Sequence, residues 1–151
     1  MTQNSFNGND DRPEVHIYRT KEGTVFEVVC GVLLLVMWVL TLWSWQHGRG
    51  TPGAQLTTDI IGTLTTVFCL ACAYRPNMIN IPTRITNERQ TWTLVRLDRI
   101  ICVEICLLFI GINLCDVLCL KAEEMVLFNI GFVIFLIVTI IIGTAQIRRI
   151  R

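Results

Sequence analysis

Four long apolar stretches divide the chain, and polar segments separate them. Each stretch is too uniformly apolar for the one-sided pattern of a soluble helix. About 20 residues cross the roughly 30 Å hydrocarbon core of a bilayer as a helix, and all four stretches reach that length. The pattern predicts an all-α membrane protein, a four-transmembrane-helix bundle with spans over residues 25–46, 56–74, 99–120 and 124–147.

The basic residues favour one orientation of this bundle. Of the 13 Lys and Arg residues, only Arg49 and Lys121 lie in the first and third connections. The others lie in the N-terminal tail, the second connection and the C-terminal end. Since basic connections stay in the cytoplasm, we predict that the N-terminus and the C-terminus are both cytoplasmic. The predicted location is the bacterial inner membrane, with several passes.

The polar segments indicate a single domain. Residues 1–23 are polar and are predicted to form a disordered tail before the transmembrane domain, residues 24–151. Residues 75–98 form the predicted cytoplasmic segment, which changes from an extended stretch to a helix at Asn87. A net charge of +1 and basic residues that serve topology argue against a nucleic-acid partner. The expected partner is the lipid bilayer, and the sequence is also compatible with a homo-oligomer.

Local signals suggest how three of the helices begin. Thr24 with Glu27, and Asn87 with Gln90, have the spacing of capping boxes, in which side chains satisfy the first backbone N–H groups. Asp59 stands near the start of the second stretch, where an acid is expected as an N-cap or first-turn residue.

All seven cysteines lie within the apolar stretches, which argues against an extracytoplasmic disulfide framework. Cys69 and Cys72 end the second stretch, and Cys102 and Cys106 open the third, so antiparallel helices would bring the two pairs to one depth. Four thiolates there could bind zinc or an iron–sulfur cluster. We favour packing, because cysteine serves as a small apolar residue in cores, and we expect no cofactor; a metal or redox site is the alternative.

Polar side chains within the spans are the second set of candidates. Asn113 and Asp116 share one face of the third span, and Asn129 should lie at a similar depth in the fourth, so hydrogen bonds between these helices are expected. Glu104 is expected to reach the cytoplasmic interface, or to pair with Arg75 or Arg99. The alternative is an oligomeric transporter or channel subunit that uses Glu104, Asn113 and Asp116.

The cytoplasmic segment is the predicted functional surface. It is the longest connection, and it places an aromatic residue among arginines at a membrane surface that carries anionic lipid. The sequence contains no phosphate loop and no nucleophile–histidine set, so we predict a non-enzymatic protein. The predicted partner-binding residues are Arg84, Arg89, Trp92 and Arg96.

Two stretches carry a resemblance to a known family. One is the first span, with Thr24–Glu27 and Leu33–Leu42; the other is Tyr74–Pro76 and Asn80–Thr86, with Trp92 in the following helix. Over roughly residues 20–110 the chain resembles a family of small bacterial membrane proteins of unknown function. That domain also occurs in the immunity and signalling protein for the Bacillus sporulation-delaying toxin.

The resemblance implies an interaction protein of the immunity or envelope-stress type, with a membrane protein or a toxin as its partner. The chain departs from the family in the outer loop. The family's Pro-x-x-Ile-Pro-x-His-Phe-Asn signature is absent, and residues 46–57 keep only a histidine and several glycines. If that loop binds the family's ligand, this function is lost or changed here.

Overall fold

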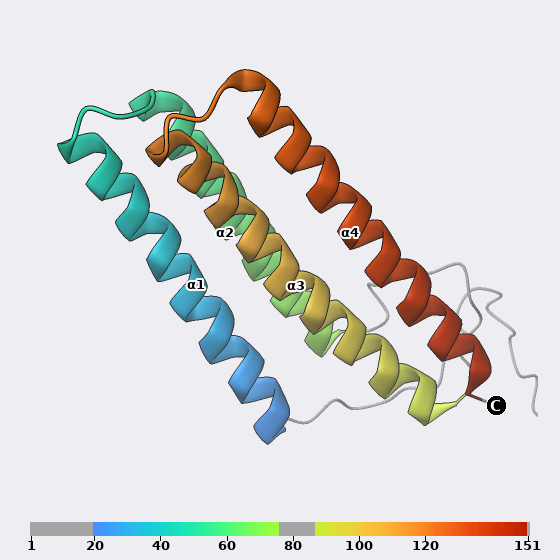
Figure 1. Ribbon diagram of the computed structural model, residues 1–151. Coiled ribbons are helices and arrows are strands. Elements are labelled where there is room, and N and C mark those ends of the chain that lie inside the picture. The colour runs from blue at the N-terminus through green and yellow to red at the C-terminus, as the bar shows by residue number, and fades with distance from the viewer. Residues whose placement is uncertain (1–19, 76–86, 151) are drawn as a thin grey trace, which may run out of the picture.

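The computed structural model describes residues 20–75 and 87–150, which form four helices and no strand. Helices that follow one another in the chain alternate in direction, as Figure 1 shows, so the fold class predicted from the sequence is confirmed. The start of α1 and the end of α4 lie at one end of the bundle, called here the inner end; the α1–α2 and α3–α4 connections lie at the outer end. The helices are α1 (Lys21–Gln46), α2 (Pro52–Tyr74), α3 (Glu88–Val117) and α4 (Ala122–Arg149).

All four helices are long and apolar enough to cross a membrane, which makes this a multi-pass membrane protein. Their outward faces carry large apolar side chains, with exposed fractions as high as 65% at Leu64 and 72% at Leu127. In water such a surface would be unfavourable, whereas in lipid it is the expected exterior.

The helix α3 is the centre of the fold. It contacts each of the other three helices, whereas α4 contacts α3 alone. Glycines allow these close approaches: a Cβ on Gly62 of α2 would lie 2.8 Å from the ring of Phe109, and Gly143 of α4 lies beneath Leu97. Small residues at helix contacts are the usual means of packing helices closely in a membrane.

Helix ends differ from the predicted capping. Thr20 caps α1, where its hydroxyl accepts a hydrogen bond from the Gly23 N–H at 3.0 Å. Glu27 lies beyond that first turn and accepts a hydrogen bond from the Tyr74 hydroxyl instead. The predicted start of α3 at Asn87 is confirmed, but the Asn87 side chain makes no capping hydrogen bond. Both capping boxes are therefore wrong, and the side chains of Glu27 and Gln90 instead bond to groups outside their own helices.

The two outer connections are tied together. The Arg49 guanidinium donates a 2.5 Å hydrogen bond to the Val117 carbonyl at the end of α3. Gly50 has φ of 72°, a conformation that glycine adopts without strain. Cys119 has φ of 53° and is exposed in the α3–α4 turn, so it does not lie within a span as predicted.

Candidate functional site

A buried polar cluster joins α1, α2 and α3 in the outer half of the bundle. The Asn113 amide of α3 donates hydrogen bonds to Asp59 of α2, at 2.7 Å, and to Thr41 of α1, at 3.1 Å. All three side chains are at most 1% exposed. Asp59 therefore does not cap α2 as predicted; it lies well inside the helix and faces the other two.

A second polar layer lies nearer the outer end. The Gln55 amide donates to the Ser44 hydroxyl at 3.1 Å and to Asp116 at 3.4 Å. The Ser44 hydroxyl in turn donates to the Arg49 carbonyl at 2.6 Å. These contacts fix the packing of the first three helices, because each buried polar group there needs a partner that lipid cannot supply.

The predicted hydrogen bonds between α3 and Asn129 are wrong. Asn113 and Asp116 bond to side chains of α1 and α2, on the opposite side of α3 from Asn129 in α4. The partners on α2 were not predicted, although the sequence of α2 contains a signal for them. The buried polar or small positions of α2 recur at helical spacing, at Gln55, Asp59, Gly62 and Thr66.

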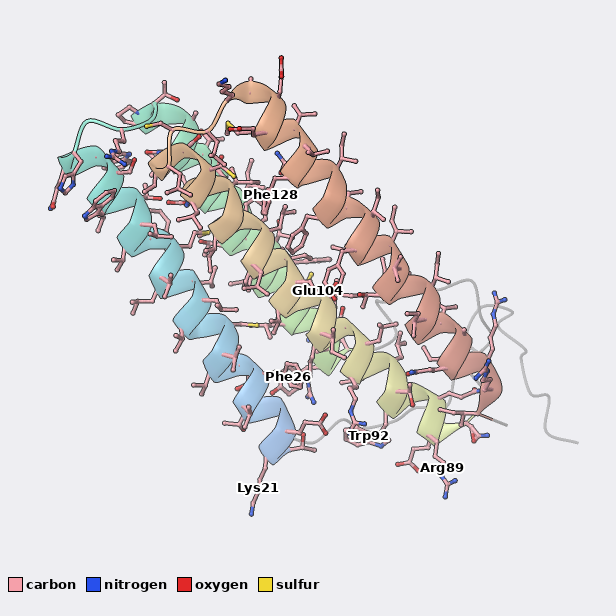
Figure 2. All side chains as sticks on the ribbon, viewed as in Figure 1. Lys21, Phe26, Arg89, Trp92, Glu104 and Phe128 are labelled. Atoms are coloured by element: carbon pink, nitrogen blue, oxygen red, sulfur yellow. The ribbon has the colours of Figure 1, made fainter. Side chains whose placement is uncertain are left out.

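Glu104 forms a separate contact between α3 and α4. It is 6% exposed, and one carboxylate oxygen accepts a 2.7 Å hydrogen bond from the Thr139 hydroxyl. The other oxygen, Oε2, has no hydrogen-bond partner. Figure 2 shows Glu104 between the two helices. The predicted pairing with Arg75 or Arg99, or extension to the interface, is therefore wrong.

The cysteines form a different group from the predicted one. Cys30 of α1 lies 3.6 Å from Cys102 of α3, sulfur to sulfur, and these two pack with Cys106. Cys69 packs against this group, whereas Cys72 does not belong to it. In the described part of the chain, no three His, Cys, Asp or Glu side chains are arranged to hold a metal ion. Cys30 was not predicted to join this group, because the sequence does not determine how α1 is aligned along α3.

The predicted partner-binding residues lie at the inner end, apart from Arg84, which lies outside the described residues. Arg89 is exposed, and the Trp92 indole donates a 3.4 Å hydrogen bond to Glu88 (Figure 2). Arg96 binds the Glu22 carboxylate through two hydrogen bonds, of 2.7 and 2.9 Å. Both residues of this pair precede the predicted spans, and the hydrogen bond from Arg96 lowers the pKa of Glu22.

A polar hollow opens between the start of α1 and α3. Its volume is about 160 Å³, and Trp92 and Arg96 lie on its wall. Arg99 also lines it, although this residue is only 4% exposed. The remaining lining residues are Thr20, Glu22 and Thr93.

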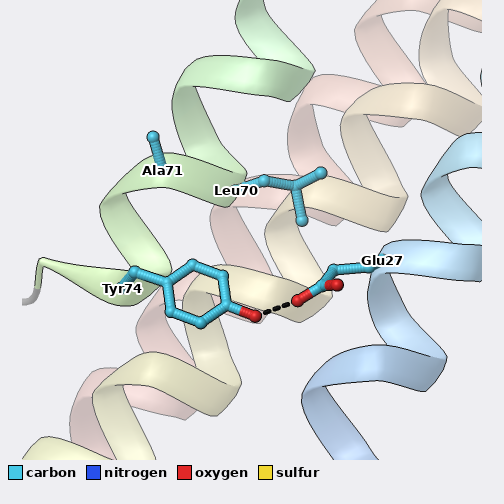
Figure 3. Close-up of a pocket in the computed structure, with 4 residues that line it drawn as sticks. All are labelled: Glu27, Leu70, Ala71 and Tyr74. Atoms are coloured by element: carbon cyan, nitrogen blue, oxygen red, sulfur yellow. Dashed lines mark hydrogen bonds between the residues drawn. The ribbon is translucent and has the colours of Figure 1, made fainter. Parts of the chain in front are cut away.

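A second, shallow hollow lies between α1 and α2 near the inner end. Figure 3 shows its four lining residues, among which the Tyr74 hydroxyl donates a hydrogen bond to Glu27. The other two, Leu70 and Ala71, are apolar. The contact closes the α1–α2 pair at the end opposite the polar layers.

The fold and these contacts define a multi-pass membrane protein with polar groups between its first three helices and a cationic hollow at its inner end. Compared with protein-family models, curated proteins and solved structures, the chain gives no match.

Proposed function

We propose that the protein is a non-enzymatic interaction protein of the bacterial inner membrane, which binds a partner at its inner end. The binding surface consists of Arg89, Trp92 and Arg96 on the first turns of α3, with Arg84 added from the sequence. The observation that carries the proposal is the position of Trp92 and Arg96 on the wall of the polar hollow. Trp and Arg are the residues most enriched at binding hot spots.

Charge selects the kind of partner. Arg89 is exposed, and the Arg96 side chain is 63% exposed even while it binds Glu22. An acidic segment of another membrane protein fits this surface, since it would meet two guanidinium groups beside an aromatic ring. An immunity-type role, implied by the family resemblance, belongs to the same proposal.

A transporter or channel has less support. Glu104 faces α4, whereas Asn113 and Asp116 bond to the opposite side of α3. A single chain therefore does not align these three groups along one path. A pore would have to form between copies, and four helices are too few for the inverted repeats of typical transporters.

Site-specific photo-cross-linking in intact membranes tests the proposal. A benzophenone amino acid replaces Arg89 in the full chain, and the matched control places it at Leu127, a lipid-facing position of α4 that is 72% exposed. We expect a discrete cross-linked protein from position 89 only. The added change Trp92→Ala should remove it without altering the amount of inserted protein.

Two results would contradict the proposal. One is the same cross-linked products from positions 89 and 127, which would mean that the contacts are not specific to the inner end. The other is a product from position 89 that persists in the Trp92→Ala and Arg96→Gln backgrounds.

A further inference from the structure

Arg99 is a buried cation that forms no close ion pair with the described residues, although the carboxylates of Asp98 and Glu22 are near enough to interact with its charge. It is 4% exposed, and its Nη2 atom has no hydrogen-bond partner. Among the described residues no ion pair reaches it, including one from its neighbour Asp98. A buried charge is strongly unfavourable unless it is paired, so this position favours an anion, and residues 20–75 and 87–150 place no carboxylate in an ion pair with it.

The backbone of α1 holds the guanidinium in place. A Cβ on Gly23 would lie 2.6 Å from the Arg99 Nη2 atom, so the guanidinium packs directly against the helix backbone at this glycine. On another side Arg99 borders the hollow, whose volume of about 160 Å³ is far larger than the ~10–15 Å³ that a single water needs. The hollow therefore has room for a small polyatomic anion and water.

The other groups around the hollow leave its charge positive. Of the charged residues that line the hollow, Arg96 and Glu22 form an ion pair and offset each other, which leaves the charge of Arg99. The Asp98 carboxyl interacts with that charge but is not part of the lining. The hollow also lies at the start of α1, a helix of 26 residues whose N-terminal end is the positive end of its dipole. The Thr20 hydroxyl accepts a bond from Gly23, so its own hydrogen remains for a ligand oxygen.

We propose that this hollow binds a phosphate group, with Arg99 as its principal ligand. A guanidinium donates two parallel hydrogen bonds to phosphate oxygens, and the amino end of a helix is suited to the same group. The phosphate comes from the headgroup of an anionic lipid or from a free phosphate ion. The site goes beyond the proposed protein partner, because it requires only the purified chain.

Thermal unfolding of the full chain in maltoside micelles, which contain no phosphate, tests this site. One arm adds inorganic phosphate, a second adds phosphatidylglycerol, and chloride at matched ionic strength is the control. We expect a rise in the unfolding midpoint, because a ligand that binds only the folded state stabilises it. A rise with lipid alone identifies the headgroup as the source, and a rise with inorganic phosphate identifies the free ion.

The variant Arg99→Met separates a binding role from a structural one. It removes the unpaired charge and keeps much of the side-chain volume, so the ligand-free midpoint should rise while the response to phosphate is lost. The matched control is Arg149→Met, at an exposed arginine of the same end but on α4, which should respond as the wild type does. Arg99→Lys should weaken binding roughly tenfold, because it keeps the charge but loses the planar fork.

Three results would overturn the phosphate site. They are no response to either ligand in the wild type, an undiminished response in Arg99→Met, and an Arg99→Lys response equal to that of the wild type. Should Arg99→Met fail to fold, Arg99→Lys decides. None of these results bears on the cross-linking from position 89, so the two proposals fail separately.

Discussion

The first three helices and α4 are held in the bundle in different ways. The most apolar 18-residue window of the four helices lies in α4, and none of it is buried; the least apolar lies in α2, and 28% of it is buried. In a soluble protein the most apolar segment would be the core. In a membrane the solvent is itself apolar, so hydropathy reports contact with lipid, and the polar positions mark the helix contacts.

The contacts themselves differ in the same sense. Between α1, α2 and α3 lie two layers of buried hydrogen bonds, with Asn113 and Gln55 as donors. The helix α4 meets only α3, along a narrow seam in which Gly143 and Ile147 are its buried residues. The Thr139 hydroxyl adds a hydrogen bond to Glu104, and the Gln90 amide of α3 donates to the Ile147 and Ile150 carbonyls at the end of α4. Substitutions between α1, α2 and α3 should therefore reduce the stability of the protein more than substitutions between α3 and α4, and the latter should loosen α4 alone.

The largest loss should follow Asn113→Ala. The change removes both hydrogen bonds of the amide and leaves Asp59 buried without a donor, so the free energy of unfolding should fall by about 3 kcal/mol. Steric trapping in bicelles measures this quantity. The matched control is Asn129→Ala on α4, for which we expect almost no change; equal losses at the two positions would remove the distinction between the helices.

An intermediate loss should follow Gly143→Leu. The new side chain would collide with Leu97 in the α3–α4 seam, and overpacking of this kind costs about 2 kcal/mol. Hydrogen exchange should speed up in α4 while α1 to α3 keep their protection. At Gly131, on the same helix, nothing lies within 4 Å of an added Cβ, so Gly131→Leu should leave exchange unchanged. Uniform acceleration across the bundle would argue against an independent α4.

A smaller loss should follow Thr139→Val. This change removes the hydroxyl that donates to Glu104 and preserves the shape of the side chain, so we expect about 1 kcal/mol. The double variant Thr139→Val/Glu104→Gln should then lose less free energy of unfolding than the two single variants lose together. Strict additivity would mean that the two side chains do not interact.

The smallest effect belongs to the Glu22–Arg96 pair, whose side chains are 45% and 63% exposed. Because Arg96 lowers the pKa of Glu22, the pair contributes above the ordinary pKa of Glu, and this contribution disappears as the pH falls through the lowered pKa of the folded state. Exposed pairs are worth less than about 1 kcal/mol. The stability difference between the wild type and Glu22→Gln should shrink from pH 7 to about pH 3 and with added salt.

Hydropathy and charge placement were sufficient to predict the number, order and alternation of the helices. The number, order and alternation of the helices depend on which segments prefer lipid and which prefer water, and a single sequence is enough to show that preference. The contacts were not predictable to the same degree. Asp59 was assigned to a cap because acids stabilise first turns, and only its register against Asn113 shows that it faces inward.

The inner-end surface illustrates the same limit. Arg89, Trp92 and Arg96 were selected from the sequence as a basic and aromatic group. In the structure all three lie on the first turns of α3, where the two arginines are exposed and Trp92 is partly buried. Arg99 was expected to serve topology or to pair with Glu104. Its burial beside Gly23 depends on the crossing of α1 and α3, a property of two helices that neither sequence segment determines alone.

The turn between α3 and α4 allows the orientation of the wild-type chain in the membrane to be measured directly. Cys119 is the exposed thiol among the seven cysteines, and the other six are buried or partly buried. A membrane-impermeant maleimide added to intact cells should therefore react at this one position if the outer end faces away from the cytoplasm. The chain thus has a built-in reporter of sidedness, and no cysteine needs to be introduced or removed to use it.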